Sequence, residues 1–243
     1  MESPSQSIVG SRTWGRTLVV MAKAPRPGTV KTRLARSLPV AAVTELYRCL
    51  LDDTLALARS LGSVQVAIVC PVSDAEDLTR LSGTAVRVVA QTGEGLAAGL
   101  TSVFAHFAAP GRRHVVAFNS DSPHLPAAVL EAAFKTLAGH DVVVGPTHDG
   151  GYYLVGAKAN HQGLFDGDGM GTKSALDALL ARARALKLSV GFTDPFYDID
   201  VEDDLTQLAA ELRHTPTRAP RTAAWLKEWA QTVVQSCTGT EDR

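Results

Sequence analysis

The sequence predicts an α/β protein of one domain, with a mixed, mostly parallel sheet that carries helices on both faces. Short apolar runs alternate with segments of helical periodicity along the first two thirds of the 243 residues. This alternation is typical of parallel strands that are buried on both sides. No segment between the predicted elements has the composition of an interdomain linker, so we expect a single domain over residues 16–234.

The first part of the chain contains four successive strand–helix pairs. The opening strand is predicted because its five residues (TLVVM) are apolar or β-branched, and the helix after it because Val43, Leu46 and Leu50 recur at helical spacing. The other pairs follow the same two patterns. In chain order they are strand 17–21 with helix 39–61, strand 64–69 with helix 73–82, strand 86–89 with helix 94–108, and strand 114–118 with helix 126–138.

The rhythm changes after the strand predicted at 141–145. A further apolar run, 152–156 (YYLVG), begins only six residues later, which is too close for a helical crossover. We therefore expect it to pair antiparallel, at or near an edge of the sheet. The remaining predicted elements are helix 173–186, strand 188–192, and helices 202–213 and 222–234. Residues 1–15 and 235–243 consist mostly of small or polar residues without a sustained apolar run, and we expect disordered tails there.

Composition excludes several classes of partner. The formal net charge is −1, so there is no general basic field to hold nucleic acid. No apolar run reaches the ~18 residues that a membrane-spanning helix needs. The three cysteines have no metal-ligand spacing, which favours a reducing compartment, and we expect a cytoplasmic protein. The sequence leaves the oligomeric state undetermined.

Ligands of such sheets bind beyond the carboxyl ends of the strands, so the residues that follow each strand are the candidate site. Four cations follow the first strand on a loop stiffened by two prolines. A glycine there lets a ligand approach the backbone. The alternative interpretation of the four cations is a charged surface exposed to solvent. Carboxylates follow the other strands, however, so cations and carboxylates meet at one rim. A bound polyphosphate with a metal ion explains this combination better. The loop residues in question are Lys23, Arg26, Lys31 and Arg33, with Pro25, Pro27 and Gly28.

Three aspartates are the candidate metal ligands. Asp121 ends the strand predicted at 114–118, and Asp198 and Asp200, two residues apart, face the same side of an extended segment. Paired carboxylates repel unless a cation lies between them, and Mg²⁺ prefers such oxygen ligands. The alternative is helix capping by Asp200 or by the acidic residues 202–204. We expect capping to explain residues 202–204 but not Asp198 with Asp200.

Two glycine-containing segments are candidates for a second ligand. The segment GDGMGTKSAL opens a predicted helix, whose N-terminus is suited to an anion, although Thr172 is equally consistent with an ordinary N-cap. The turn HDGGYY places Asp149 and Tyr152 at the same rim, or is only a hairpin turn. His124, His148 and His161 share no ligand spacing, and we expect them on the surface or hydrogen-bonded. Residues 93–98 match G-x-G-x-x-A, a weak indication of a dinucleotide-dependent oxidoreductase.

In combination, MAKAPRPGTVKTRLA, NSDSPHLP, GPTHDGGYYLVG and DIDVEDDL resemble the bacterial rSAM/selenodomain-associated transferase 1 family, a former domain of unknown function. That family belongs to the nucleotide-diphospho-sugar transferase superfamily with the GT-A fold. A more distant similarity is to the phospholactate/phosphoenolpyruvate guanylyltransferases of cofactor F420 synthesis. The resemblance implies a GT-A domain over most of the chain and a bound Mg²⁺ or Mn²⁺.

The residues and the resemblance together give an expected site. Its nucleotide-binding part is Ala22, Lys23, Gly28, Lys31 and Arg33, and its metal ligands are Asp121, Asp198 and Asp200. Lys31, Arg33 and Asp121 are also expected to be catalytic. A small anionic acceptor is expected at Asp149, Gly150, Gly151, Tyr152, Gly171, Thr172 and Ser174.

Three functions fit these residues. The first is metal-dependent transfer of NMP from an NTP to a small phosphorylated or carboxylate acceptor, with release of pyrophosphate; the four cations favour it because a triphosphate needs much positive charge. The second is a GT-A glycosyltransferase with an NDP-sugar donor, in which Asp149 acts as a base. The third is a degenerate nucleotide-binding module, suggested because residues 91–100 (QTGEGLAAGL) lack the Asp-Leu-Gly-x-Arg-Met of the related transferases.

Overall fold

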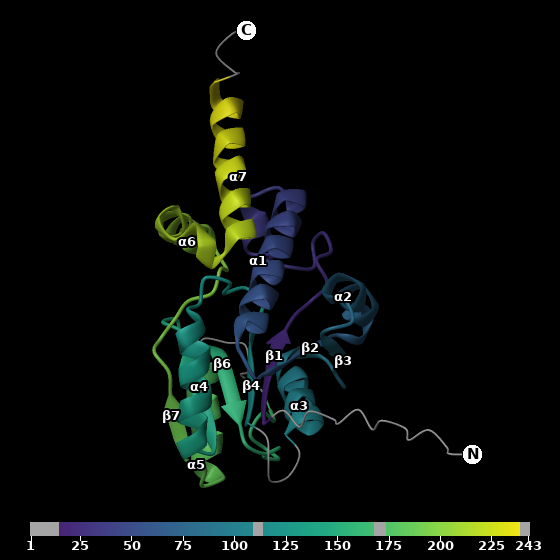
Figure 1. Cartoon of the computed structure of the whole chain (residues 1–243), viewed down its shortest axis with the longest axis vertical. Helices are drawn as coiled ribbons and strands as arrows, with labels where there is room; N and C mark the ends of the chain where they lie inside the picture. Colours follow the sequence, from purple (N-terminus) through teal and green to yellow (C-terminus); the bar gives the residue numbers. More distant parts are fainter. Residues whose placement is uncertain (1–14, 109–113, 168–173, 239–243) are drawn as a thin grey trace, which may run out of the picture.

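The computed structural model describes residues 15–108, 114–167 and 174–238. Within them, seven strands form one sheet in the order β3-β2-β1-β4-β6-β5-β7. Figure 1 shows β3 and β7 on opposite sides of this sheet. β6 runs antiparallel to β4 and β5, and the other neighbouring pairs are parallel. The strands are β1 (Arg16–Met21), β2 (Gln65–Cys70), β3 (Arg87–Ala90), β4 (His114–Asn119), β5 (Val142–Pro146), β6 (Tyr152–Ala157) and β7 (Val190–Phe192).

Helices cover both faces of the sheet because the strands bury both of theirs. Successive side chains of β1 point to opposite faces, so Leu18 and Val20 pack with one set of helices and Val19 with the other. The first set is α1 (Val40–Ser60), α2 (Ala75–Ser82) and α4 (Ala127–Gly139). The second is α3 (Gly95–Phe107) and α5 (Ala175–Ala185). The short 3₁₀ turns η1 (Leu34–Arg36), η2 (Val72–Asp74) and η3 (Pro216–Arg218) complete the connections.

A third apolar cluster lies beyond the carboxyl ends of the parallel strands. There α6 (Glu202–His214) and α7 (Pro220–Thr238) pack against α1, with Leu46, Leu50 and Leu208 fully buried between them. Buried Asp53 of α1 accepts hydrogen bonds from the backbone and hydroxyl of Thr222, and so fixes the first turn of α7. Figure 1 shows α6 and α7 at the end of the molecule to which β1 points.

The predicted fold class and element types are confirmed, with two corrections. β6 is antiparallel as expected, but it lies inside the sheet between β4 and β5 rather than at or near an edge. Its burial explains this position, since five of its six residues are buried, as in a strand with neighbours on both sides. The last helix continues to Thr238, into the segment expected to be a tail. None of the helices in the described part of the chain could span a membrane.

Candidate active site

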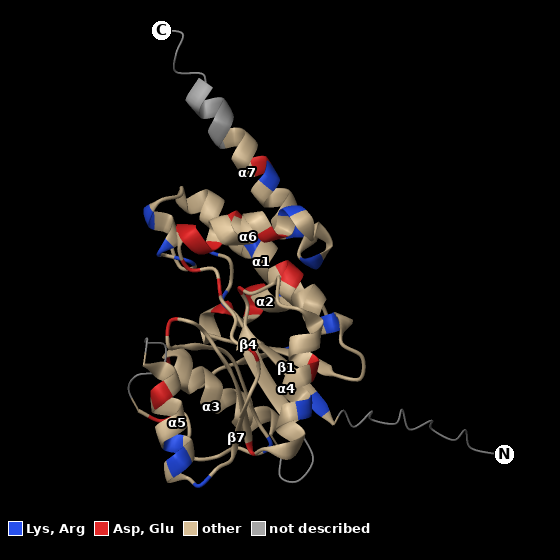
Figure 2. Ribbon diagram, turned by 90° about the vertical axis from the view of Figure 1, so that its left-hand side faces the viewer, with Lys and Arg blue, Asp and Glu red and all other residues tan. Residues whose placement is uncertain are grey.

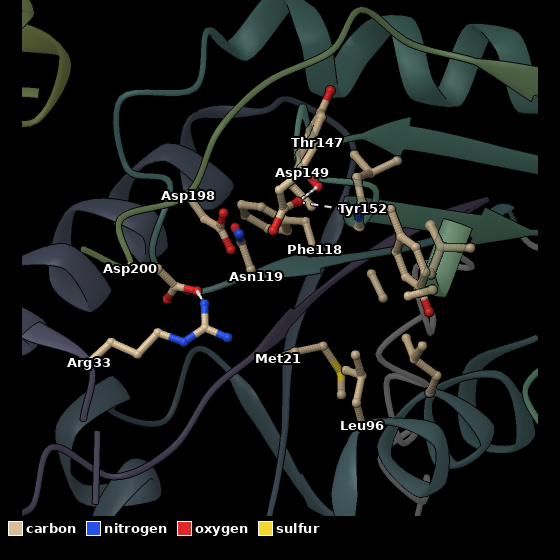
Figure 3. Close-up of a pocket in the computed structure, with 17 residues that line it drawn as sticks. Met21, Arg33, Leu96, Phe118, Asn119, Thr147, Asp149, Tyr152, Asp198 and Asp200 are labelled. Atoms are coloured by element: carbon tan, nitrogen blue, oxygen red, sulfur yellow. Dashed lines mark hydrogen bonds and ion pairs between the residues drawn. The ribbon is translucent and has the colours of Figure 1, made fainter. Parts of the chain in front are cut away.

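Two cavities meet at the carboxyl end of the sheet. The larger, of about 970 Å³, lies between the loop after β1, the ends of β2 and β3, and the first turn of α3. The smaller, of about 230 Å³, lies over the ends of β4 and β6 and is shown in Figure 3. The two share four lining residues: Met21, Arg33, Leu96 and Asp200. Figure 2 shows charged residues of both signs on the loops between the sheet and α6.

Asp121, Asp198 and Asp200 form a carboxylate cluster at the junction of the two cavities. One oxygen from each lies within 4.8 Å of the others. Asp121 lines the larger cavity, Asp198 lines the smaller one, and Asp200 lines both. The structure therefore brings together the three residues that the sequence marked as metal ligands.

Hydrogen bonds between side chains and the backbone hold the cluster in place. The Ser122 hydroxyl donates to the carbonyl of Tyr197 at 3.1 Å, which joins the loop of Asp121 to the segment of Asp198. The Asp204 carboxylate accepts from the N–H groups of Asp200 and Val201, both at 2.8 Å, at the start of α6. Capping thus falls to Asp204, as expected, and the Asp200 side chain is left for the cluster.

Two cations of the loop contact the cluster. The Lys31 ammonium donates to Asp121 and, at 3.0 Å, to Asp200, and its side chain is only 5% exposed. Burial alone would lower the pKa of Lys31, but the negative charges of Asp121 and Asp200 outweigh it and raise the pKa. Arg33 pairs with the other oxygen of Asp200 at 3.1 Å, as Figure 3 shows. Burial, followed by repulsion from Asp121, raises the pKa of Asp198 to about 7.

The cationic loop (residues 22–33) is fixed by neighbouring elements. The backbone N–H of Lys23 donates to the Tyr47 hydroxyl of α1 at 3.1 Å. Gly28 has φ +74°, a turn conformation for which glycine is suited, and it lies outside the lining of both cavities. Ala22, Lys23, Lys31 and Arg33, the other four residues expected to bind the nucleotide, line the larger cavity.

Arg26 has a different role from the other cations of the loop. Its guanidinium donates to Asp74 at 2.8 Å, to Asp77 and to the carbonyl of Ser73. Asp74 also accepts from the N–H of Ala24 at 2.9 Å. Arg26 therefore ties the cationic loop to η2 and α2, and three of the four cations remain at the cavity wall.

The smaller cavity has a mainly apolar wall and a few polar groups. Asp149 is oriented by the Thr147 hydroxyl at 2.5 Å and by the N–H of Gly151 at 3.2 Å. A Cβ at Gly151 would lie 2.9 Å from the Thr147 hydroxyl, so a larger residue there would push this hydroxyl out of place. Asn119 lies between Asp198 and Phe118 in Figure 3. Its buried amide has no hydrogen-bond partner among the described residues.

The expected acceptor residues are placed in part. Asp149, Gly151 and Tyr152 line the smaller cavity. Gly150 does not line it; its carbonyl accepts from the N–H of Leu176 and so joins the turn to α5. Ser174 directly precedes α5, and its neighbour Ala175 lines the cavity. Gly171 and Thr172 lie outside the described residues.

One expectation about the histidines is wrong. His124 is fully buried, and neither ring nitrogen has a hydrogen-bond partner among the described residues. Its ring packs against Phe196 and Tyr197, at centroid distances of 4.8 and 4.5 Å. Burial lowers the pKa of His124 to about 4, so the ring is neutral.

The cluster fits a hard divalent cation by its donor set. All three ligands are carboxylates, which suit Mg²⁺ and Mn²⁺ better than softer metals. One oxygen of Asp121 is buried and has no partner among the described residues, as expected of a group that needs a further ligand. Asp121, Asp198 and Asp200 are thus the residues that would hold such an ion.

The comparisons with known proteins agree with this fold. The family model described as "Uncharacterized protein conserved in bacteria (DUF2064)" matches residues 54–172. No curated protein matches the sequence significantly. A Desulfovibrio desulfuricans G20 protein, provisionally named a nucleotide-diphospho-sugar transferase, is 27% identical with a TM-score of 0.82. The match covers 91% of this chain and 97% of that one.

Two more distant structures share the fold. A nucleotidyl transferase from Methanothermobacter is 20% identical, has a TM-score of 0.58, and is matched over 82% of this chain and 98% of its own. The 4-diphosphocytidyl-2C-methyl-D-erythritol synthase of Anaerococcus prevotii is 11% identical, has a TM-score of 0.56, and is matched over 82% and 96%. These three solved structures carry the names of nucleotidyl or nucleotide-sugar transferases, and the two more distant ones show that the fold is shared.

Proposed function

We propose that this protein is a metal-dependent nucleotidyltransferase that moves NMP from an NTP to a small phosphorylated or carboxylate acceptor. The observation that carries the proposal is the position of the carboxylate cluster at the junction of the two cavities. A group held by the cluster can touch a ligand in each cavity at once. That arrangement suits the transfer of a group from a donor in one cavity to an acceptor in the other.

The larger cavity suits the NTP. Lys23, Lys31 and Arg33 line it, and together they offset the charge of a triphosphate and of the pyrophosphate that leaves. An oxygen of the acceptor phosphate or carboxylate attacks the α-phosphorus, and the bond to the β-phosphate oxygen breaks. When bound, Mg²⁺ or Mn²⁺ would neutralise charge that develops on the phosphate oxygens. The reaction needs no covalent nucleophile from the protein.

A glycosyltransferase with an NDP-sugar donor is the second candidate, and one observation favours it. Asp149 lines the smaller cavity, and two hydrogen bonds from Thr147 and Gly151 fix its carboxylate. An oriented carboxylate there is suited to act as a base on a sugar acceptor. The 27% identity to a protein provisionally named a nucleotide-diphospho-sugar transferase supports the same candidate.

The test is a screen for pyrophosphate release and for thermal stabilisation. The four NTPs and several NDP-sugars are offered with Mg²⁺ or Mn²⁺, against a panel of small phospho-acids and sugar phosphates. We expect one NTP to raise the melting temperature, and pyrophosphate to appear only with an acceptor. Asp198→Asn is the control variant, and it should release none.

The outcomes separate the candidates. Stabilisation by an NDP-sugar with release of NDP, and without pyrophosphate, would replace nucleotidyl transfer by glycosyl transfer. Binding of a nucleotide with no turnover of any donor would favour the degenerate binding module. Gly93 and Gly95, from the segment that suggested the module, line the larger cavity, which supports testing this candidate alongside the other two.

A further inference from the structure

The Lys31 ammonium lies among the oxygens that a metal ion would need. It contacts one oxygen of Asp121 and one oxygen of Asp200. Arg33 takes the second oxygen of Asp200 at 3.1 Å. Both oxygens of Asp200 therefore already accept from cations of the protein, so an ion that joins Asp121 and Asp200 competes with Lys31 and Arg33 for the same oxygens.

Adding a divalent ion to the cluster has a large electrostatic cost unless Lys31 or Arg33 moves away. With Lys31 and Arg33 in place, two positive charges offset the three carboxylates of the cluster. The Lys31 side chain is 5% exposed, so solvent screens its charge poorly. A divalent ion would therefore meet a buried positive charge at its own binding position.

Lys31 also faces the cavity that suits a polyphosphate. Lys31 and Arg33 both line the larger cavity, together with Lys23. The phosphate oxygens of a ligand in this cavity are negatively charged, like the carboxylates. They can therefore replace the carboxylates as partners of Lys31 and Arg33. The Lys31 backbone is held at φ +47°, uncommon for a residue other than glycine, and its carbonyl accepts from Ala35 at 3.1 Å. A rotation of the side chain is thus enough to move the ammonium, with the backbone in place.

We propose that Lys31 makes metal binding depend on the nucleotide, by occupying the carboxylate cluster until phosphate groups draw its ammonium away. The proposal rests on the proposed function and adds a selection step to it. The cluster would discriminate against the free ion and accept the ion together with a polyphosphate. Lys31 would then contact the carboxylates before the nucleotide binds and the phosphates afterwards.

The test is direct titration of the full-length protein with Mn²⁺, without nucleotide, followed by electron paramagnetic resonance. Lys31→Met keeps much of the side-chain length but removes the charge. We expect it to bind Mn²⁺ at least about tenfold more tightly than the wild type, because removing a unit charge close to a divalent ion relieves repulsion of that order or more. Lys31→Asn is a second variant, since asparagine tolerates the positive φ. Both variants are first checked for folding by circular dichroism in EDTA.

Lys23→Met is the matched control, because Lys23 belongs to the same loop and cavity wall and its side chain makes no ion pair with the described carboxylates. Its Mn²⁺ affinity should stay close to that of the wild type. Adding Asp198→Asn to Lys31→Met should abolish binding.

Two failures are distinguishable. If Mn²⁺ binding requires Asp198 but Lys31→Met and Lys31→Asn bind no more tightly than the wild type, the inference about Lys31 is overturned and the metal site remains. If no variant binds Mn²⁺, or if Asp198→Asn has no effect on binding, the metal site of the proposed function fails and the inference fails with it.

Discussion

At the scale of single residues, the hydroxyl of Tyr47 connects the cationic loop to the carboxylate cluster. It accepts from the N–H of Lys23 at 3.1 Å and lies 2.9 Å from the hydroxyl of Ser120, which directly precedes Asp121. Tyr47 is 4% exposed, and burial raises the pKa of its hydroxyl. The side chain therefore stays protonated and fixes the spacing between the groups expected to bind phosphate and those expected to bind metal.

Tyr47→Phe should weaken nucleotide binding as well as the fold. The change leaves the Lys23 N–H without its partner and costs roughly 1–2 kcal/mol of unfolding free energy, measured by urea denaturation. It should also reduce the thermal shift given by the stabilising NTP. Tyr153→Phe is the control, because its hydroxyl bonds to Thr193 at 2.8 Å, away from the cationic loop. Equal thermal shifts in both variants would contradict a positioning role for Tyr47.

The site residues that could be predicted from the sequence are those that directly follow a predicted strand or share one side of an extended segment. Asp121 follows a buried strand, and Asp198 and Asp200 share one side of an extended segment, so sequence order and residue type were enough to group them. Tyr47 gave no such signal, because it fits the apolar periodicity of α1. Asp74 resembles any acidic residue near a helix start. Their contacts with Lys23 and Ala24 join segments 24 and 50 residues apart, which local patterns do not encode.

At the scale of elements, η2 and α2 hold the cationic loop through Asp74. This carboxylate is 7% exposed and contacts both the backbone of Ala24 and the guanidinium of Arg26. Within the loop, Asp77 contacts only the Arg26 guanidinium; it also pairs with Arg80 of its own helix at 2.8 Å, and its side chain is 34% exposed. The loop is thus attached to η2, whose Val72 and Ser73 line the larger cavity together with the preceding Pro71.

Asp74→Asn should loosen the loop more than Asp77→Asn. The asparagine keeps the size of Asp74 but loses its charge and one of its two acceptor oxygens, so it cannot accept from both Arg26 and the Ala24 N–H as the carboxylate does. We expect the Ala24 amide to exchange its hydrogen about tenfold faster, as for a loss of about 1.4 kcal/mol. Native-state hydrogen exchange read by NMR measures this directly. If both variants exchange at the same rate, the attachment of the loop does not depend on Asp74.

The elements themselves were predictable because strand and helix periods differ, and all expected strands and helices are present with small shifts at their ends. The place of β6 was not. Six residues between two strands predict antiparallel pairing with β5, and that pairing exists. The pairing of β6 with its second neighbour, β4, could not be predicted from the sequence. These strands are more than thirty residues apart in the chain, and their pairing depends on which edge of the sheet is still open.

At the scale of the whole molecule, buried His124 should make the stability of the fold depend on pH. Its pKa is about 4 in the folded protein, against about 6.5 in an unfolded chain, chiefly because burial disfavours the charged ring. Glu211 opposes the shift and Arg218 adds to it. Between these two values the unfolded chain binds more protons than the folded one. Stability from this residue is therefore complete above pH 6.5 and is lost as the pH falls towards 4.

His124→Phe removes this contribution and suits the aromatic surroundings of Phe196 and Tyr197. The loss of unfolding free energy between pH 7 and pH 4 should be smaller in the variant than in the wild type by about 3 kcal/mol. Urea denaturation at several pH values, in EDTA to exclude metal, measures both slopes. At pH 7 the variant should be about as stable as the wild type, because the neutral ring makes no hydrogen bond among the described residues that phenylalanine would break. Parallel slopes for the two proteins would show that other groups set the acid sensitivity of the fold.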